Sequence, residues 1–146
     1  MLALLQRVQR AQVQVAGSTV AEIGPGLLVL VCAEPADTPL QATKLVDKLL
    51  KLRIFADENG KMNRSVQDVG GALLIVSQFT LAADASQGNR PSYTGAAPAE
   101  LGRSLYEEVL ALARARHPQV QAGVFGADMQ VSLVNDGPVT VPLTIR

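Results

Sequence analysis

The feature that most constrains the fold is a run of seven apolar residues at positions 27–33, directly after Gly24-Pro25-Gly26. A strand that is apolar at every position, rather than at alternate positions, must be covered on both of its faces. The run is far shorter than the ~20 apolar residues that cross a bilayer. We therefore expect residues 27–33 to form a central strand, buried on both sides, in a chain with no membrane association.

Further strands are predicted wherever short apolar or alternating runs end at turn residues, namely residues 2–8, 12–16, 19–23 and 72–76. The first three form an antiparallel meander, with a turn at Gly17-Ser18. The polar segment 57–60 predicts a small hairpin rather than catalytic carboxylates, because Asp, Asn and Gly favour solvated turns.

Two helices are predicted. Thr38, Pro39 and Gln41 form a capping box with proline at the first helical position, and leucines and valine follow at helical spacing up to Leu52. Residues 98–116 form the second helix, which ends at His117-Pro118. Residues 83–97 between the strands and this helix have no periodicity, and unstructured loops of that length tend to be functional. The pattern predicts a single α+β domain over residues 1–146.

Composition limits the function classes. Thirteen basic and thirteen acidic residues give zero formal net charge, which argues against broad binding to a nucleic-acid duplex, so DNA is not an expected partner. A local site for an RNA end remains compatible with this net charge. The apolar residues 1–5 stop before a signal-peptide core could form, so we expect a cytoplasmic protein.

The chain has few of the residues and motifs that are common in enzyme active sites. Its one histidine, His117, stands at a predicted helix end, where a capping or exposed position is expected, and its one cysteine, Cys32, lies in the apolar run and is expected to be buried. Zinc-ligand spacing, the GxSxG elbow and the phosphate-binding glycine motifs are all missing from the sequence. We therefore expect neither a metal nor a cofactor.

Two polar clusters at predicted strand ends remain as a candidate site. The first is Ser77-Gln78-Phe79-Thr80 and the second runs from Asn135 to Thr140. Each cluster alone could be a loop with hydroxyl caps, but together they favour a site where backbone N–H groups stabilise an oxyanion. Thr80 has no visible base to activate it as a nucleophile, so a hydrogen bond to substrate is its more plausible role.

The junction Asn135-Asp136-Gly137-Pro138 joins the two strand-like runs of the last eighteen residues. Asn-Asp-Gly is a hairpin signal, yet a plain hairpin would avoid the following proline, which has no N–H to donate to a returning strand. Gly137 accepts almost any φ, and an X–Pro bond is the peptide link that can be cis at low cost. The junction could thus present two backbone carbonyls side by side.

At these residues the chain resembles the D-aminoacyl-tRNA deacylase family, which hydrolyses D-amino acids from mischarged tRNA. The resemblance runs end to end, through residues 6–8, 22–30, 52–55, 60–63, 77–81, 89–92, 125–133 and 135–140. It implies a mostly antiparallel, barrel-like sheet with two main helices, assembled as a homodimer. The implied partner is the 3′-terminal adenosine end of aminoacyl-tRNA.

The resemblance also implies roles for individual residues. Ser77, Gln78, Phe79 and Thr80 match the pocket segment that holds the aminoacyl ester. Gly137 and Pro138 match a Gly-cisPro dipeptide that enters the active site of the other subunit and rejects L substrates.

Supporting positions are implied as well. Arg7 matches the residue that orients the Gly-Pro carbonyls. Phe125 and Met129 match positions near the terminal adenosine or the dipeptide. Asn135 belongs to the motif that contains Gly137 and Pro138. The 2′-hydroxyl of the adenosine is thought to assist hydrolysis in the family, which agrees with the missing base.

Exclusion of L side chains would leave many D-amino acids, and glycine mischarged on alanine tRNA, as substrates. The chain departs from the family pattern at Ala82, where a tyrosine is common, and at residues 85–88, where lysines are replaced by Ala-Ser-Gln-Gly. These changes lower the positive charge available for tRNA contact, although Arg90 remains.

Two other hypotheses stay open on the sequence alone. One is a non-catalytic module that binds RNA ends on the same scaffold. The other is a general ester hydrolase with Thr80 as its nucleophile.

Overall fold

The computed structural model describes residues 1–146 and consists of a six-stranded sheet, a small two-stranded sheet and two α-helices. The elements in chain order are β1 (Leu2–Val15), β2 (Ser18–Ile23), β3 (Gly26–Cys32), α1 (Pro39–Lys51), β4 (Phe55–Ala56), β5 (Met62–Arg64), β6 (Ala72–Ser77), the 3₁₀ helix η1 (Phe79–Ala82), α2 (Ala99–Arg116), β7 (Val120–Ala122) and β8 (Gln130–Thr144).

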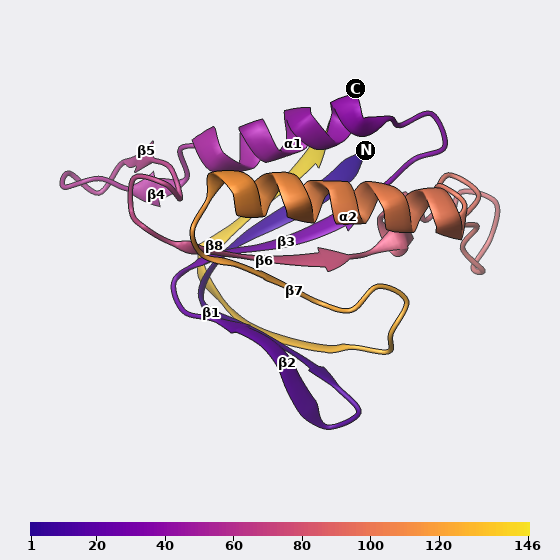
Figure 1. Ribbon diagram of the computed structural model, residues 1–146, viewed down its shortest axis with the longest axis horizontal. Helices are drawn as coiled ribbons and strands as arrows, with labels where there is room; N and C mark the ends of the chain where they lie inside the picture. The colour runs from indigo at the N-terminus through magenta and orange to yellow at the C-terminus, as the bar shows by residue number, and fades with distance from the viewer.

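The large sheet has the order β2-β1-β3-β6-β7, and β8 also pairs with β1. The pairs that β1 makes with β2, β3 and β8 are antiparallel, whereas β3–β6 and β6–β7 are parallel. The long strands β1 and β8 curve away from the helices and carry the β1–β2 hairpin beneath the rest of the sheet (Figure 1). The result is the expected α+β fold, with a nearly closed, mostly antiparallel, barrel-like sheet.

Strand β3 lies in the middle of the sheet, as its sequence predicts. Every residue of β3 except Leu30 is buried. At its start, a Cβ atom on Gly26 would lie 2.0 Å from the carbonyl oxygen of Ala72, so only glycine allows β6 to approach this closely. Because β3 and β6 are parallel, their carboxyl ends lie at the same edge of the sheet.

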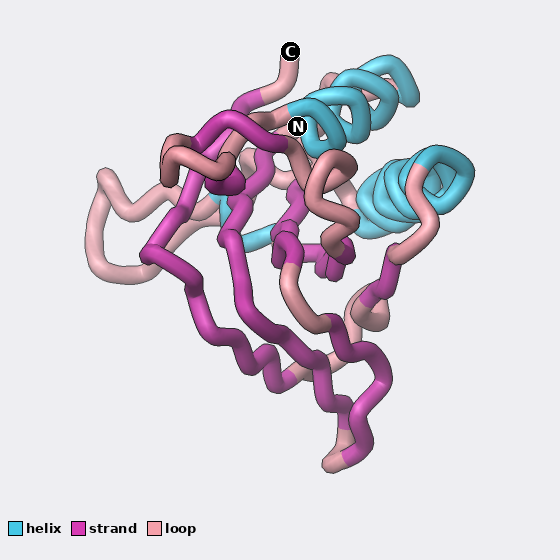
Figure 2. Tube along the Cα trace, turned by 90° about the vertical axis from the view of Figure 1, so that its left-hand side faces the viewer, coloured by secondary structure: helices cyan, strands magenta, loops and turns pink.

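Both helices pack side by side against one face of the sheet (Figures 1 and 2). Helix α1 begins with the predicted capping box, in which Thr38 and Gln41 satisfy each other's backbone donors. A core of 22 buried residues fills the space between helices and sheet, and a second core of 9 lies inside the curve of the sheet. Neither helix is long and apolar enough to cross a membrane.

The sequence-based assignment was wrong at two places. Residues 2–8 and 12–16 are not separate strands, because β1 continues through Gln9 and Arg10, whose side chains face solvent. Strand β7 was not predicted, since three residues give no readable period. His117 is the C-cap of α2, one of the two positions expected for it; it is 5% accessible, and its Nε2 lies 2.7 Å from the carbonyl oxygen of Gly71.

The two C-terminal runs do not form a hairpin. Both pair antiparallel with β1, so that Asn135 stands opposite Val8 and Thr140 opposite Gln6. Residues 136–139 therefore bulge out opposite Arg7 alone, and within this bulge the Gly137–Pro138 peptide bond is cis. The proline is tolerated because the bulge needs no N–H at that position.

Candidate active site

A cavity of about 620 Å³ opens at the edge where β3 and β6 end, within the size range of small-ligand sites. Its walls come from the ends of these two strands, from the loop before α2, from α2 itself and from residues 125–129 before β8. Fifteen of its twenty lining residues are hydrophobic. The cavity can therefore enclose an apolar or aromatic group while main-chain atoms at the strand ends supply polarity.

Ser77, Gln78 and Phe79 form the strand-end wall of this cavity. The backbone N–H of Gln78 donates to the carbonyl oxygen of Val31 at 2.7 Å, and this bond holds the turn from β6 into η1 against β3. Amides at the beginning of a helix have no partner within it, and the N–H groups of Phe79 and Thr80, the first two residues of η1, donate no backbone hydrogen bond.

The side chains of this segment divide between the cavity and its mouth. Phe79 is 56% accessible and packs edge-on against Tyr93, with ring centroids 5.2 Å apart. Gln78 donates from Nε2 to Thr80 Oγ1 at 2.6 Å. Thr80 does not line the cavity, and no histidine, lysine or carboxylate hydrogen-bonds to its hydroxyl.

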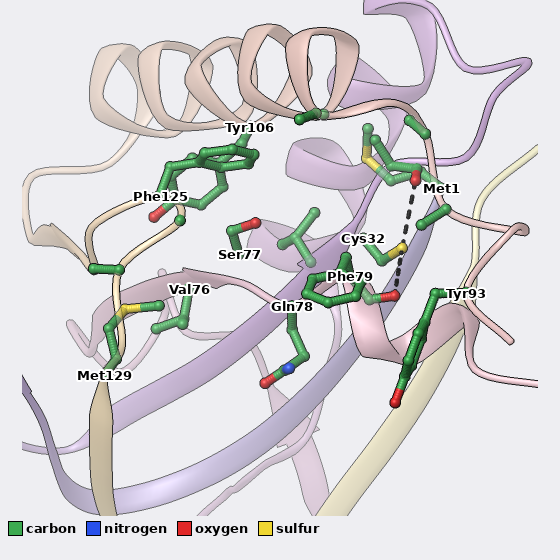
Figure 3. A pocket seen from close by; sticks show the side chains of 18 of the residues that line it. Met1, Cys32, Val76, Ser77, Gln78, Phe79, Tyr93, Tyr106, Phe125 and Met129 are labelled. Atoms are coloured by element: carbon green, nitrogen blue, oxygen red, sulfur yellow. Dashed lines mark hydrogen bonds between the residues drawn. The ribbon is translucent and has the colours of Figure 1, made fainter. Parts of the chain in front are cut away.

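Phe125 and Met129 form the opposite wall (Figure 3). The Phe125 ring lies beneath α2, 5.9 Å from the Tyr106 ring, and the Arg103 guanidinium stacks over it at 4.6 Å from the centroid. Cation–π stacking of this kind fixes an aromatic ring at a cavity rim. The wall thus presents a planar apolar surface beside a positive charge.

Two of the titratable side chains that line the cavity, those of Cys32 and Tyr106, are held neutral, whereas Tyr93 and the Asp128 carboxylate belong to exposed residues of its wall. Desolvation raises the pKa of the Cys32 thiol above its ordinary value, and the thiol points toward the carbonyl oxygens of Ala33 and Phe79. Burial raises the pKa of Tyr106 to about 12, and its hydroxyl donates to the carbonyl oxygen of Ile75 at 2.7 Å. Neither group can supply a nucleophilic anion near neutral pH.

The remaining predicted residues gather at the bulge of β8, outside this chain's cavity. Arg7 Nε donates to the carbonyl oxygen of Asp136 at 2.9 Å and its Nη1 to that of Ile54 at 2.8 Å. Gly137 and Pro138, next along the chain, are exposed. The structure therefore separates the predicted residues into a cavity group and a bulge group.

Sequence reasoning missed the cavity residues Tyr106 and Tyr93, and also Arg103, which stacks over the Phe125 ring. Tyr106 lies three residues before the apolar Val109 in α2, so helical spacing alone could have placed it on the inner face. Tyr93 and Arg103 carry no such signal, because an exposed aromatic or cationic residue in a loop or on a helix looks like ordinary surface.

Comparison with known proteins gives a consistent picture. The model of the D-Tyr-tRNA(Tyr) deacylase family matches residues 4–144. Proteins named D-aminoacyl-tRNA deacylase are similar over 99% of this chain: that of Methylibium petroleiphilum is 70% identical with 95% of its length covered, and that of Azoarcus sp. is 68% identical with 96% covered.

Two solved structures share the fold. A protein named c-Myc DNA unwinding element binding protein is 40% identical, with a TM-score of 0.95 over 100% of this chain and 99% of its own. A probable eukaryotic D-amino acid tRNA deacylase is 18% identical, with a TM-score of 0.83 over 97% of both chains, and supports the fold alone. With a family model that spans nearly the whole chain and relatives of such high identity, the chain belongs to the D-Tyr-tRNA(Tyr) deacylase family of enzymes.

Proposed function

We propose that this protein hydrolyses the ester bond of D-aminoacyl-tRNA, releasing the D-amino acid and tRNA, and that it rejects L-aminoacyl-tRNA by exclusion. The observation that carries the proposal is the separation of the two groups of site residues. Ser77, Gln78 and Phe79 line the cavity, whereas Gly137 and Pro138 lie exposed outside it.

The cavity suits the 3′-terminal adenosine and its aminoacyl group. Phe125 and Met129 offer an apolar wall for the nucleoside, and the start of η1 offers amide donors for the ester oxygen. One such donor is worth roughly 3–4 kcal/mol when it stabilises a developing oxyanion. Since no side-chain base hydrogen-bonds in this region, the 2′-hydroxyl of the adenosine assists the attack by water, as the family resemblance implies.

Rejection of L substrates requires a second copy of the chain. In a homodimer, the exposed Gly137–Pro138 bulge of one subunit enters the cavity of the other and places its carbonyls against the Cα of the bound aminoacyl group. An L side chain then collides with them, a D side chain points away, and glycine fits in either case. Glycine mischarged on alanine tRNA is therefore a second substrate.

The proposed partner is the end of aminoacyl-tRNA rather than a nucleic-acid duplex. Zero net charge disfavours broad duplex binding, which sets this proposal apart from the DNA binding named for one structural relative. Arg90 and Arg103, which make no ion pair, are available for local contact with the RNA. Acting on charged tRNA in the cytoplasm, the protein serves chiral proofreading, translation quality control and D-amino acid catabolism.

Hydrolysis of D-Tyr-tRNA, L-Tyr-tRNA and glycyl-tRNA(Ala) at equal concentrations tests the proposal. We expect turnover of the D ester and the glycyl ester and background rates on the L ester. Equal rates on D and L esters, or none on the D ester, would rule the proposal out.

Two further arms separate the alternative hypotheses. A Thr80→Ala variant keeps most of the activity if the 2′-hydroxyl assists hydrolysis, and loses nearly all of it if Thr80 is the nucleophile. A single-turnover assay with excess protein shows release of the D-amino acid, whereas a binding module would retain intact D-Tyr-tRNA.

A further inference from the structure

We propose that the side-chain amide of Asn135 is a positioning residue that fixes the Gly137–Pro138 bulge and thereby sets the selectivity for D over L substrates. This inference rests on the proposed function, because it assigns a role to the bulge in rejecting L substrates. It concerns an amide–hydroxyl clasp made by Asn135 and Thr140, which are the last paired residues on either side of the bulge.

Both polar atoms of the Asn135 side chain are used within the bulge. Its Oδ1 accepts a hydrogen bond from the backbone N–H of Val139 at 2.9 Å. Its Nδ2 donates to Thr140 Oγ1 at 2.8 Å. One side chain at the beginning of the bulge therefore holds the backbone and a side chain at its end.

The Val139 contact replaces a bond that the sheet cannot provide. Residues 136–139 have no partner in the register between β1 and β8, so the Val139 N–H has no ladder carbonyl opposite it. Without Asn135 this donor would turn to water, and the bulge would gain other conformations. The clasp thus selects one shape of the bulge from several that the chain allows.

Arg7 holds the other side of the bulge. It donates to the carbonyl oxygen of Asp136 and is itself anchored on the carbonyl oxygen of Ile54. Asp136 and Val139 are therefore fixed, while Gly137 and Pro138 between them remain exposed and make no side-chain hydrogen bond. Gly137 and Pro138 are thus held rigidly from both sides, although neither residue is itself the partner in these hydrogen bonds.

Rigid presentation matters because exclusion works by contact. A bulge that moves by about 1 Å no longer collides with an L side chain, whereas the side chain of a D substrate points away from the bulge in either position. Loss of the clasp should therefore raise the rate on L substrates more than it lowers the rate on D substrates. A role in stability alone would lower both rates together.

The test compares three variants with the wild type in kcat/KM for D-Tyr-tRNA and L-Tyr-tRNA and in the midpoint of urea unfolding. Asn135→Ala removes both bonds, and we expect the D/L ratio of kcat/KM to fall about tenfold or more. Thr140→Val removes only the hydroxyl acceptor at nearly constant shape and should give a smaller fall. Thr140→Ser keeps the hydroxyl and should restore the wild-type ratio.

Each other outcome overturns the inference. An unchanged ratio in Asn135→Ala, or D and L rates that fall in parallel with stability, would show that the clasp does not position the bulge. If Asn135→Ala does not fold, Thr140→Val against Thr140→Ser decides alone: equal ratios in these two variants contradict the role.

A Pro138→Ala variant separates failure of this inference from failure of the proposed function. If Pro138→Ala also leaves the D/L ratio unchanged, the bulge does not reject L substrates and the proposed function is wrong on that point. If Pro138→Ala relaxes selectivity and Asn135→Ala does not, the bulge acts as proposed but does not need the clasp.

Discussion

Gly137 is the residue whose backbone most restricts what can replace it. Its φ of +136° lies in the region that favours glycine. A Cβ atom here would also lie 2.8 Å from Val139 Cγ2 and 3.1 Å from Arg7 Nη2, so a side chain would push against the residues that hold the bulge. Backbone strain and collision therefore act together at this position.

We expect Gly137→Ala to destabilise the protein by about 1–3 kcal/mol in urea unfolding and to lower the D/L selectivity, because the bulge must shift. Gly88→Ala is the matched control: Gly88 has a similar φ of +145°, but a Cβ atom there would meet nothing within 4 Å. It should show the strain without the loss of selectivity. Selectivity that falls equally in both variants would contradict the collision with Arg7.

At the scale of elements, Tyr106 connects helix α2 to strand β6 just before the site. Its hydroxyl donates to the Ile75 carbonyl oxygen, which also accepts from the Gly123 N–H at 3.1 Å. Removing the hydroxyl leaves this carbonyl with one partner, so Tyr106→Phe should cost only about 1 kcal/mol. Tyr93→Phe, which changes an exposed ring without a hydroxyl contact, should cost less and serves as the control.

The stability difference between the wild type and Tyr106→Phe should depend on pH. Because burial raises the pKa of Tyr106 to about 12, above the unfolded value near 10, its neutral form favours the folded state. This contribution is complete below about pH 10 and is lost as pH rises toward 12. In urea unfolding, the advantage of the wild type over Tyr106→Phe should therefore shrink over this interval and then reverse, and a constant difference would contradict the assignment.

Elements with a strong local signal could be predicted from the sequence, and those defined by their partners could not. The apolar run of β3 and the capping box of α1 place both elements correctly, because each signal can be recognised within a few consecutive residues. Strand β7 exists only through its pairing with β6. Likewise, the direction of the chain after Pro138 depends on β1, which lies more than a hundred residues away in sequence.

For the whole molecule, the predicted site residues lie at two separate places on the chain. Ser77, Gln78, Phe79, Phe125 and Met129 share one cavity. The bulge lies elsewhere on the same chain, and no local pattern could show this, since the separation depends on how β8 continues along β1. That distribution is compatible with the arrangement that the family resemblance implies, and we predict that one subunit's bulge serves the other subunit's cavity.

Mixed dimers provide the test at this scale. Ser77→Trp fills the cavity but keeps an intact bulge, and Pro138→Ala keeps the cavity but removes the ring that fixes φ at the bulge. We expect Ser77→Trp dimers to be inactive and Pro138→Ala dimers to hydrolyse L-Tyr-tRNA.

In a mixed dimer isolated with two affinity tags, the open cavity receives the intact bulge of the other subunit. Activity on D-Tyr-tRNA is then retained at about half the wild-type rate per dimer, and L-Tyr-tRNA is rejected again. Hydrolysis of the L ester by the mixed dimer would mean that each bulge serves its own chain, and light scattering that finds only monomers at micromolar concentration would contradict the shared site altogether.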